Sequence, residues 1–150
     1  MAMITLTLPW PVSANRYWQS FVPRGATRAI VHLSTEAKAY KKAIALACVT
    51  AGIRKPLLGR LVLTLQLYPH RPLDYLARQR KLGDAWDDTV QCIDLGNADK
   101  VLSDALNGIV YDDDKQIWRI VMDRMEPDGE ARVIVTIDHL APRTLVVQLP

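Results

Sequence analysis

The segment IDLGNADKVLSDALNGIVYDDDKQI, residues 93–117, combines an amphipathic helix pattern with a run of three aspartates. Residues 97–107 place apolar side chains at i, i+3, i+4, i+7 and i+8, which is the spacing of a helix with a single apolar face. Asn107-Gly108 is typical of a helix end. The adjacent carboxylates repel one another by about 1 kcal/mol per pair at ~4 Å even in water, so their grouping needs a physical reason.

The helix and the connection after it have matching lengths. Residues 97–107 would span about 16 Å as a helix, and Gly108–Asp112 would span about 16 Å when extended. If the chain turns back along the helix, Asp113 and Asp114 return to the helix start beside Asp94. Clusters of carboxylate oxygens suit Mg²⁺ or Mn²⁺. The sequence therefore suggests a site for a divalent cation, with Lys100 one turn away.

Composition alone favours a simpler interpretation of this segment. Acid-rich turns before a strand are commonly solvated connections, and Lys100 and Asp104 would then form an i, i+4 pair on an exposed helix face. The run is not an EF-hand loop, because the alternating oxygen ligands and the central glycine are missing.

The rest of the chain predicts strands and one further helix. Ser34 is positioned to cap a helix that runs to about Ala51 and closes at Gly52. Residues 117–125 and 131–137 are expected to be strands joined by the turn EPDG, hence a hairpin. The other expected strands are residues 4–8, 60–68 and 145–149. The order βαβαββ implies one α+β domain over residues 1–150, with two helices packed on a mixed α/β sheet.

Two stretches, near residues 19–33 and 70–91, lack a sustained period and carry basic residues, so we expect mobile basic loops there. The formal net charge of +3 is compatible with a nucleic-acid partner. Cys48 is expected to be a buried free thiol, and neither it nor Cys92 belongs to a CxxC pair, which argues against structural zinc. No signal peptide and no apolar run of ~18 residues is present, so we expect a cytoplasmic protein with no membrane partner.

Residues 93–117 resemble the RusA family of Holliday junction resolvases, whose pattern is D-x-D-N-x-x-K-x-x-x-D-A-L and then a short return ending D-D-x-Q-[VI]. A second similarity lies in residues 4–18, ITLTLPWPVSANRYW, which resemble the family's opening strand and its P-x-S-x-N-R-Y signature. The resemblance implies a small α/β homodimer that binds four-way DNA junctions and cuts two opposed strands symmetrically in recombination and repair. It also implies Mg²⁺ or Mn²⁺ and no small-molecule cofactor.

By position, Asp94, Asp113 and Asp114 match the family's metal-binding aspartates, and Lys100 matches the lysine required for cleavage. The resemblance thus gives Asp94, Lys100 and Asp114 as catalytic residues. Asn97 and Asp104 also match family positions. The expected DNA contacts are Asn97, Arg16 in the N-terminal motif, and a basic cluster in the loop before the first aspartate: Arg71, Arg78, Arg80 and Lys81. Core packing is favoured over base stacking for Trp10 and Trp18.

The chain departs from the family pattern at Gly96, where the second aspartate is expected. Losing a carboxylate should weaken metal affinity; Asp87, Asp88 or Asp99 are candidates to supply a replacement oxygen, and Asp112 is expected to be a solvated neighbour. Three interpretations stay open: a compensated active enzyme, which we favour because the other acidic residues and Lys100 persist, a junction-binding protein with little activity, and an altered sequence. An unrelated interaction domain with a solvated acidic turn is the remaining alternative.

Overall fold

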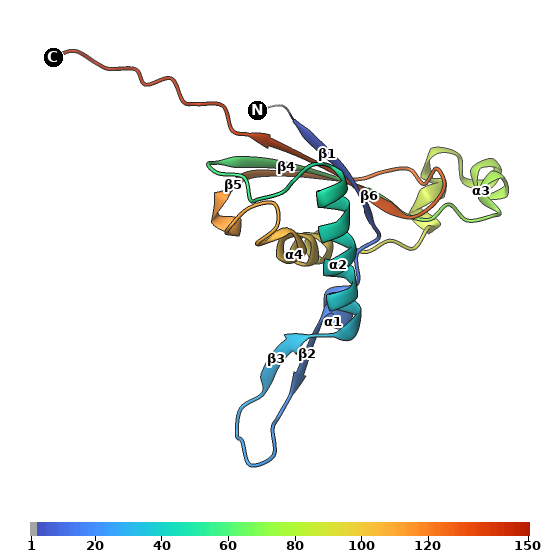
Figure 1. Ribbon diagram of the computed structural model, residues 1–150. Coiled ribbons are helices and arrows are strands. Elements are labelled where there is room, and N and C mark those ends of the chain that lie inside the picture. The colour runs from blue at the N-terminus through green and yellow to red at the C-terminus, as the bar shows by residue number, and fades with distance from the viewer. Residues whose placement is uncertain (1–2) are drawn as a thin grey trace.

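The computed structural model, which describes residues 3–150, contains a mixed four-stranded sheet covered by helices on one face (Figure 1). The strands lie in the order β1-β6-β4-β5, where β4 and β5 are parallel and the other neighbours are antiparallel. Their bounds are β1 Ile4–Pro9, β4 Leu61–Tyr68, β5 Ile117–Arg124 and β6 Arg132–His139. The predicted α+β class with a mixed sheet is confirmed.

The helices differ in length and position. The two long ones, α2 (Thr35–Thr50) and α4 (Leu95–Leu106), cover the sheet, whereas α1 (Ala14–Tyr17) is a single turn. The remaining elements are the helix α3 (Tyr75–Leu82), the 3-10 turns η1 (Gly83–Thr89) and η2 (Asp114–Gln116), and the strands β2 (Trp18–Phe21) and β3 (Ile30–Leu33), which pair apart from the main sheet.

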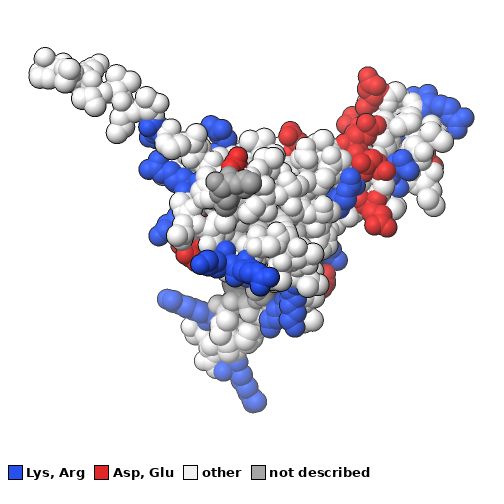
Figure 2. All heavy atoms as spheres, turned by 45° about the horizontal axis from the view of Figure 1, so that its top comes forward, with Lys and Arg blue, Asp and Glu red and all other residues white. Residues whose placement is uncertain are grey.

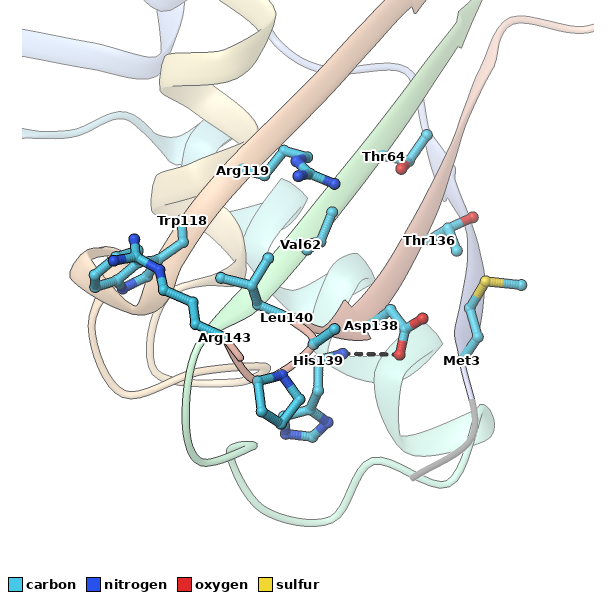
Figure 3. A pocket seen from close by; sticks show the side chains of 12 residues that line it. Met3, Val62, Thr64, Trp118, Arg119, Thr136, Asp138, His139, Leu140 and Arg143 are labelled. Carbon is cyan, nitrogen blue, oxygen red and sulfur yellow. Dashed lines mark hydrogen bonds between the residues drawn. The ribbon is translucent and has the colours of Figure 1, made fainter. Parts of the chain in front are cut away.

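β4 shows how the sheet divides into a covered and an open face. Leu61, Leu63, Leu65 and Leu67 are buried beneath the helices, while the alternate side chains are only half-buried, because side chains in a strand point to opposite faces. Figure 3 shows a hollow on the open face, to which strands β4, β5 and β6 all contribute. The lining includes Arg119 and Asp138 but none of the predicted site residues.

α4 is the crossover between the parallel strands β4 and β5, which cannot be joined by a tight turn. Its whole predicted apolar face is buried: Ala98, Val101, Leu102, Ala105 and Leu106. The helix begins at Leu95, earlier than predicted, because the Asp94 carboxylate accepts a hydrogen bond from Asn97 N (2.8 Å) and so caps the first turn. Ser34 caps α2 as predicted, accepting from Ala37 N at 3.0 Å.

The predicted hairpin of residues 117–125 and 131–137 is wrong. β5 and β6 do not pair with each other, since β4 lies between them and pairs with both. The connection instead carries the chain across the end of β4, where Met125 N donates to Leu67 O (2.8 Å) and Gly129 O accepts from Arg71 N (2.9 Å). Residues 145–149 do not form the predicted strand, and their apolar side chains are exposed.

Both expected basic loops contain secondary structure. Residues 19–33 lie in a β2–β3 hairpin, whose four-residue strands are too short to show a clear period in the sequence. Residues 70–91 contain α3 and η1, and Trp86 anchors η1 by burying its ring and donating from Nε1 to Glu126 Oε1 (2.9 Å). Trp10 and Trp18 pack against the core, as favoured, and Cys48 is a buried free thiol. Across residues 3–150 no helix has the length and apolarity needed to span a membrane.

Gln116 fastens the start of β5 to the chain before β4. Its Nε2 donates to Leu57 O (2.9 Å) and Gly59 O (3.0 Å), and its Oε1 accepts from Asp112 N (2.9 Å). We expect Gln116→Ala to lower the free energy of unfolding by about 1–3 kcal/mol, because backbone groups lose their partners. Urea unfolding measures the change, with Lys115→Ala at the exposed neighbouring position as the control; an equal loss in both variants would contradict this role for Gln116.

Candidate active site

Three of the predicted site residues meet where α1 approaches the start of α4. Arg16, Asp94 and Asn97 line one open hollow of about 590 Å³, together with residues that follow β4 such as His70. Asp94 is exposed, although one carboxylate oxygen is used as the helix cap. Arg16 lies 3.6 Å from Glu36 and keeps 64% of its side chain exposed, so its guanidinium faces solvent.

Two hydrogen bonds join α1 to α4. Asn97 Oδ1 accepts from Ala14 N (2.6 Å), and Tyr17 donates its hydroxyl proton to Asp104 Oδ2 (2.5 Å). Burial raises the pKa of Tyr17, and the hydrogen bond and negative charge of Asp104 raise it further, so the hydroxyl stays protonated and can donate. Asn97 and Asp104, both on the family pattern, therefore hold the N-terminal motif against α4.

The i, i+4 pair of Lys100 and Asp104 does not form. Asp104 instead faces Tyr17 and Lys41, whose Nζ lies 3.7 Å from Oδ2. Lys100 is exposed and makes no ion pair with the part of the chain that the structure describes. Its ammonium group is thus accessible to a phosphate, about one and a half turns along the helix that Asp94 caps.

Asp113 and Asp114 do not return to the helix start. Asp112 and Asp113 line a different hollow, which includes Gly59 and Arg60 just before β4, whereas the Asp94 hollow includes Pro69 and His70 just after it. The eight residues of β4 separate the two regions, roughly 25 Å at the rise of a strand. Oxygen ligands of one divalent cation lie within ~2.6 Å of it, and the structure does not bring Asp94 and Asp113 together in one hollow of the chain.

The segment after α4 does not run back along the helix, because its residues form a buried turn. Gly108 N donates to Tyr111 O (2.7 Å), which folds the segment tightly instead of extending it. Val110 and Tyr111 are fully buried, and Leu57 N bonds to Val110 O (2.7 Å). The aspartate run therefore follows at the end of the sheet where β5 has to start in order to run parallel to β4.

The donor set around Asp94 does not fit a divalent cation in a single chain. Glycine occupies position 96, and in residues 3–150 no three histidine, cysteine or acidic side chains are grouped closely enough to hold an ion. Among the candidate replacements, Asp99 Oδ1 accepts from Ser103 Oγ (2.9 Å). Asp87 lines a separate hollow with Trp86, and Asp88 is exposed on η1.

Asp99 and Asp114 nevertheless act on the same side chain. Burial raises the pKa of Tyr111, and the negative charges of Asp114 and then Asp99 raise it further. Tyr111 donates its hydroxyl to Ser103 O (2.7 Å), the residue that also holds Asp99. Asp113 is fully exposed, and the backbone N–H of Lys115, which donates to Oδ1 at 2.9 Å, lowers its pKa. Asp113 therefore keeps its negative charge at neutral pH.

The predicted basic cluster lies in a lobe whose charges balance. Arg78 donates from Nε to Asp74 (2.9 Å) and from Nη1 to Thr89 O (3.2 Å), so its charge is paired. Arg71 lies over the ring of Tyr75, with Cζ 4.1 Å from the centroid. Residues 70–91 contain four basic and four acidic residues, and Figure 2 shows both colours on this lobe. The exposed Arg80 and Lys81 are the remaining accessible cations of the four.

Sequence reasoning missed Tyr17 and Gln116 as supporting residues. Both stand inside the quoted motifs, Tyr17 at the end of N-R-Y and Gln116 at the end of D-D-x-Q. Tyr17 links the first motif to α4, and Gln116 fixes the acidic run at the start of β5. Their fixed positions in the motifs, beside the charged residues, were the feature of the sequence that could have identified them as supporting residues.

The site combines an exposed aspartate and lysine of α4 with an arginine of α1, and acidic and basic groups of this kind are the ones that nucleases use on phosphodiesters. Comparison with family models identifies the class more narrowly, because residues 9–138 match the model described as endodeoxyribonuclease RusA. The chain belongs to the RusA family of endodeoxyribonucleases, which resolve Holliday junctions and generally use a divalent metal. A search of curated proteins finds no match.

The link between Tyr17 and Asp104 predicts a measurable stability contribution. We expect Tyr17→Phe to lower the free energy of unfolding by about 1–3 kcal/mol, because a part-buried carboxylate loses a hydrogen bond. Thermal or urea unfolding measures it. Tyr68→Phe is the matched control, since the Tyr68 hydroxyl has no hydrogen-bond partner among residues 3–150. A loss in Tyr17→Phe no larger than in the control would show that the bond is not stabilising.

Proposed function

We propose that the protein is a metal-dependent, structure-selective endonuclease that resolves four-way DNA junctions by symmetric phosphodiester hydrolysis in recombination and repair. The observation that carries the proposal is the RusA family match over residues 9–138. The resemblance of residues 93–117 to the family pattern assigns Asp94, Lys100, Asp113 and Asp114 to its acidic and basic positions. Mg²⁺ or Mn²⁺ is the proposed cofactor, because carboxylate oxygens suit small divalent cations.

In this proposal Asp94, Asp113 and Asp114 are the metal ligands, and Asp94, Lys100 and Asp114 act in catalysis. The Lys100 ammonium group stabilises the negative charge that develops on the phosphodiester oxygens. Arg16, on the rim of the Asp94 hollow, contacts the DNA backbone beside the cleavage site. Asn97 presents its amide nitrogen to DNA while its oxygen remains bound to Ala14 N. In the α3 lobe, residues 70–91, phosphates are contacted by four basic residues: Arg71, Arg78, Arg80 and Lys81. Arg80 and Lys81 are exposed and make the main contacts.

The separation of the acidic groups supports a homodimer. Asp94 lines a hollow beside the end of β4 and Asp113 lines one beside its start, and in this proposal two copies of the chain bring the two groups to one ion. Symmetric incision of two opposed strands also requires two sites. A twofold pairing that sets the start of α4 in one copy against η2 of the other would supply both sites at once.

The second candidate function is a junction-binding protein with weak catalysis. Two observations favour it: glycine replaces the family's second aspartate, and among residues 3–150 no three histidine, cysteine or acidic side chains are grouped closely enough to hold an ion. This candidate predicts tight junction binding with little nicking in either Mg²⁺ or Mn²⁺.

Cleavage of a synthetic four-way junction tests the proposal directly. We expect symmetric nicks with Mg²⁺ or Mn²⁺, and Lys100→Ala should lower the cleavage rate by about 10²–10³-fold, because a charge that stabilises the transition state is removed. Junction affinity measured without divalent metal should change by less than about threefold, since a single phosphate contact is lost.

Lys38→Ala is the control for this variant, because Lys38 is an exposed lysine on α2. An intact junction in both metals would overturn the nuclease. A Lys100→Ala variant that loses binding in proportion to cleavage would show that Lys100 holds DNA and does not act in the chemical step.

Gly96→Asp distinguishes a compensated enzyme from a disabled one. A Cβ at position 96 would lie 3.6 Å from Asp94 Oδ1, an ordinary contact, so the substitution fits without backbone strain. If the site is weakened by the missing carboxylate, Gly96→Asp should raise the cleavage rate at least tenfold, an expectation equivalent to about 1.4 kcal/mol. Gly96→Ala is the matched control, because it adds a Cβ and raises helix propensity without supplying a ligand. Equal rates for all three proteins would indicate that the natural site is already compensated.

A further inference from the structure

The β2–β3 hairpin projects from the body of the protein as an arm (Figure 1). Its strands pair from Trp18↔Leu33 to Phe21↔Ile30, and residues 22–29 form the tip. The arm pairs with no strand of the main sheet. A lone two-stranded hairpin is at best marginally stable in water. An arm that adds little to the stability of the fold is a candidate for binding a partner.

The charge of the arm has one sign. Residues 18–34 contain Arg24 and Arg28 at the tip and no aspartate or glutamate. Both arginines are exposed, and neither forms an ion pair within the described chain. The arm thus differs from the α3 lobe, where acidic residues match the basic ones in number. Unpaired guanidinium groups on a projecting element suit phosphate oxygens.

The arm also presents aromatic and apolar surface. The ring of Phe21 is 49% exposed and meets the ring of His32 edge to face, with centroids 5.4 Å apart. Both residues, with Trp18, line an open hollow along the arm. Ile30 and Val31 are 49% and 65% exposed. Aromatic groups beside a basic track are the features that hold unstacked bases.

The base of the arm is fastened to the helix that carries Asp94 and Lys100. Tyr17, the residue before β2, bonds to Asp104 on α4. On the returning strand, Ser34 Oγ donates to Arg16 O (2.5 Å), which closes the base of the hairpin. DNA held by the arm is therefore kept in a fixed position relative to the start of α4.

We infer that the β2–β3 arm is a DNA-binding element that contacts the branch point of a junction. Arg24 and Arg28 bind backbone phosphates, and Phe21 with His32 stacks against the exposed face of a base at the branch point. This inference rests on the proposed function, because it requires branched DNA as the ligand. At the centre of an open four-way junction the last base pair of each arm lacks a stacking neighbour on one side, whereas inside a linear duplex every pair is stacked on both sides, so the arm favours the branched form.

The first test removes the charge of the tip. Binding of wild-type protein and of Arg24→Ala/Arg28→Ala to a four-way junction is measured without divalent metal over a salt series. We expect affinity to fall at least tenfold and the slope of log affinity against log salt to become shallower by about 1.8, the value for two phosphates. Arg24→Lys/Arg28→Lys should keep most of the wild-type affinity and most of the wild-type salt slope, because the charge is retained. Arg54→Ala/Lys55→Ala, at an exposed connection beyond α2, removes the same charge as a control.

The second test follows the bases. A junction with 2-aminopurine at the branch point should brighten when wild-type protein binds and unstacks it. With Phe21→Ala at saturating protein, the rise in 2-aminopurine fluorescence should be at most half of that with the wild type. With Phe21→Trp, which retains an aromatic ring, binding should still change the fluorescence. The salt dependence of Phe21→Ala should stay that of the wild type, since no charge is removed.

The alternative occupant of the arm is a second copy of the chain. Light scattering of each variant separates the two, because an arm that holds the dimer would yield monomers when Phe21 or the tip arginines are changed. That result would overturn the inference, as would wild-type affinity and salt slope in Arg24→Ala/Arg28→Ala. A wild-type protein that binds no junction would overturn the proposed function as well, whereas junction binding unaffected by the arm variants would overturn the arm alone.

Discussion

Burial of one face of α4 is the constraint on which the rest of the structure depends. Val101, Leu102 and Leu106 are fully buried, and each large apolar side chain contributes about 1.5–3 kcal/mol when it leaves water. Repulsion between exposed carboxylates is worth about 1 kcal/mol per pair. Core packing therefore sets the direction of the helix, and the acidic residues lie wherever the helix and its connections place them. Asp94 stands at one end of β4 and Asp113 at the other for this reason.

Local patterns predicted the elements well, because their causes are local. The Ser34 cap and the apolar spacing of α4 require only neighbours in sequence, and the structure contains both. Strand pairing is not local, and the turn EPDG looked like a hairpin connection although β4 lies between β5 and β6. The hairpin at residues 18–33 was missed for a related reason, since its strands are short and mostly exposed, and neither face is consistently apolar.

The candidate site was predictable in its residues but not in its geometry. The motif pointed to Arg16, Asp94 and Asn97, and the structure places all three around one hollow. The expected return of Asp113 assumed that residues 108–112 would extend. The sequence there contains Ile109, Val110 and Tyr111, and apolar residues after a helix fold into the core in preference to following the helix surface. The length of a connection therefore predicts where it ends only when its residues are not needed in the core, because a buried residue is not free to extend the chain.

The links between α1 and α4 explain why the two motifs of the family occur together. Together with the burial of Tyr17, they fix the position of Arg16 relative to Asp94. Asn97 and Asp104 accept hydrogen bonds from Ala14 and Tyr17, so one helix face holds the N-terminal motif while Lys100 stays exposed. Each of these hydrogen bonds occupies an oxygen acceptor of α4 that would otherwise be available to DNA or a metal ion. A small domain that binds branched DNA gains more from holding its contacts at fixed separations than from one further flexible ligand, because preorganised groups lose less entropy on binding.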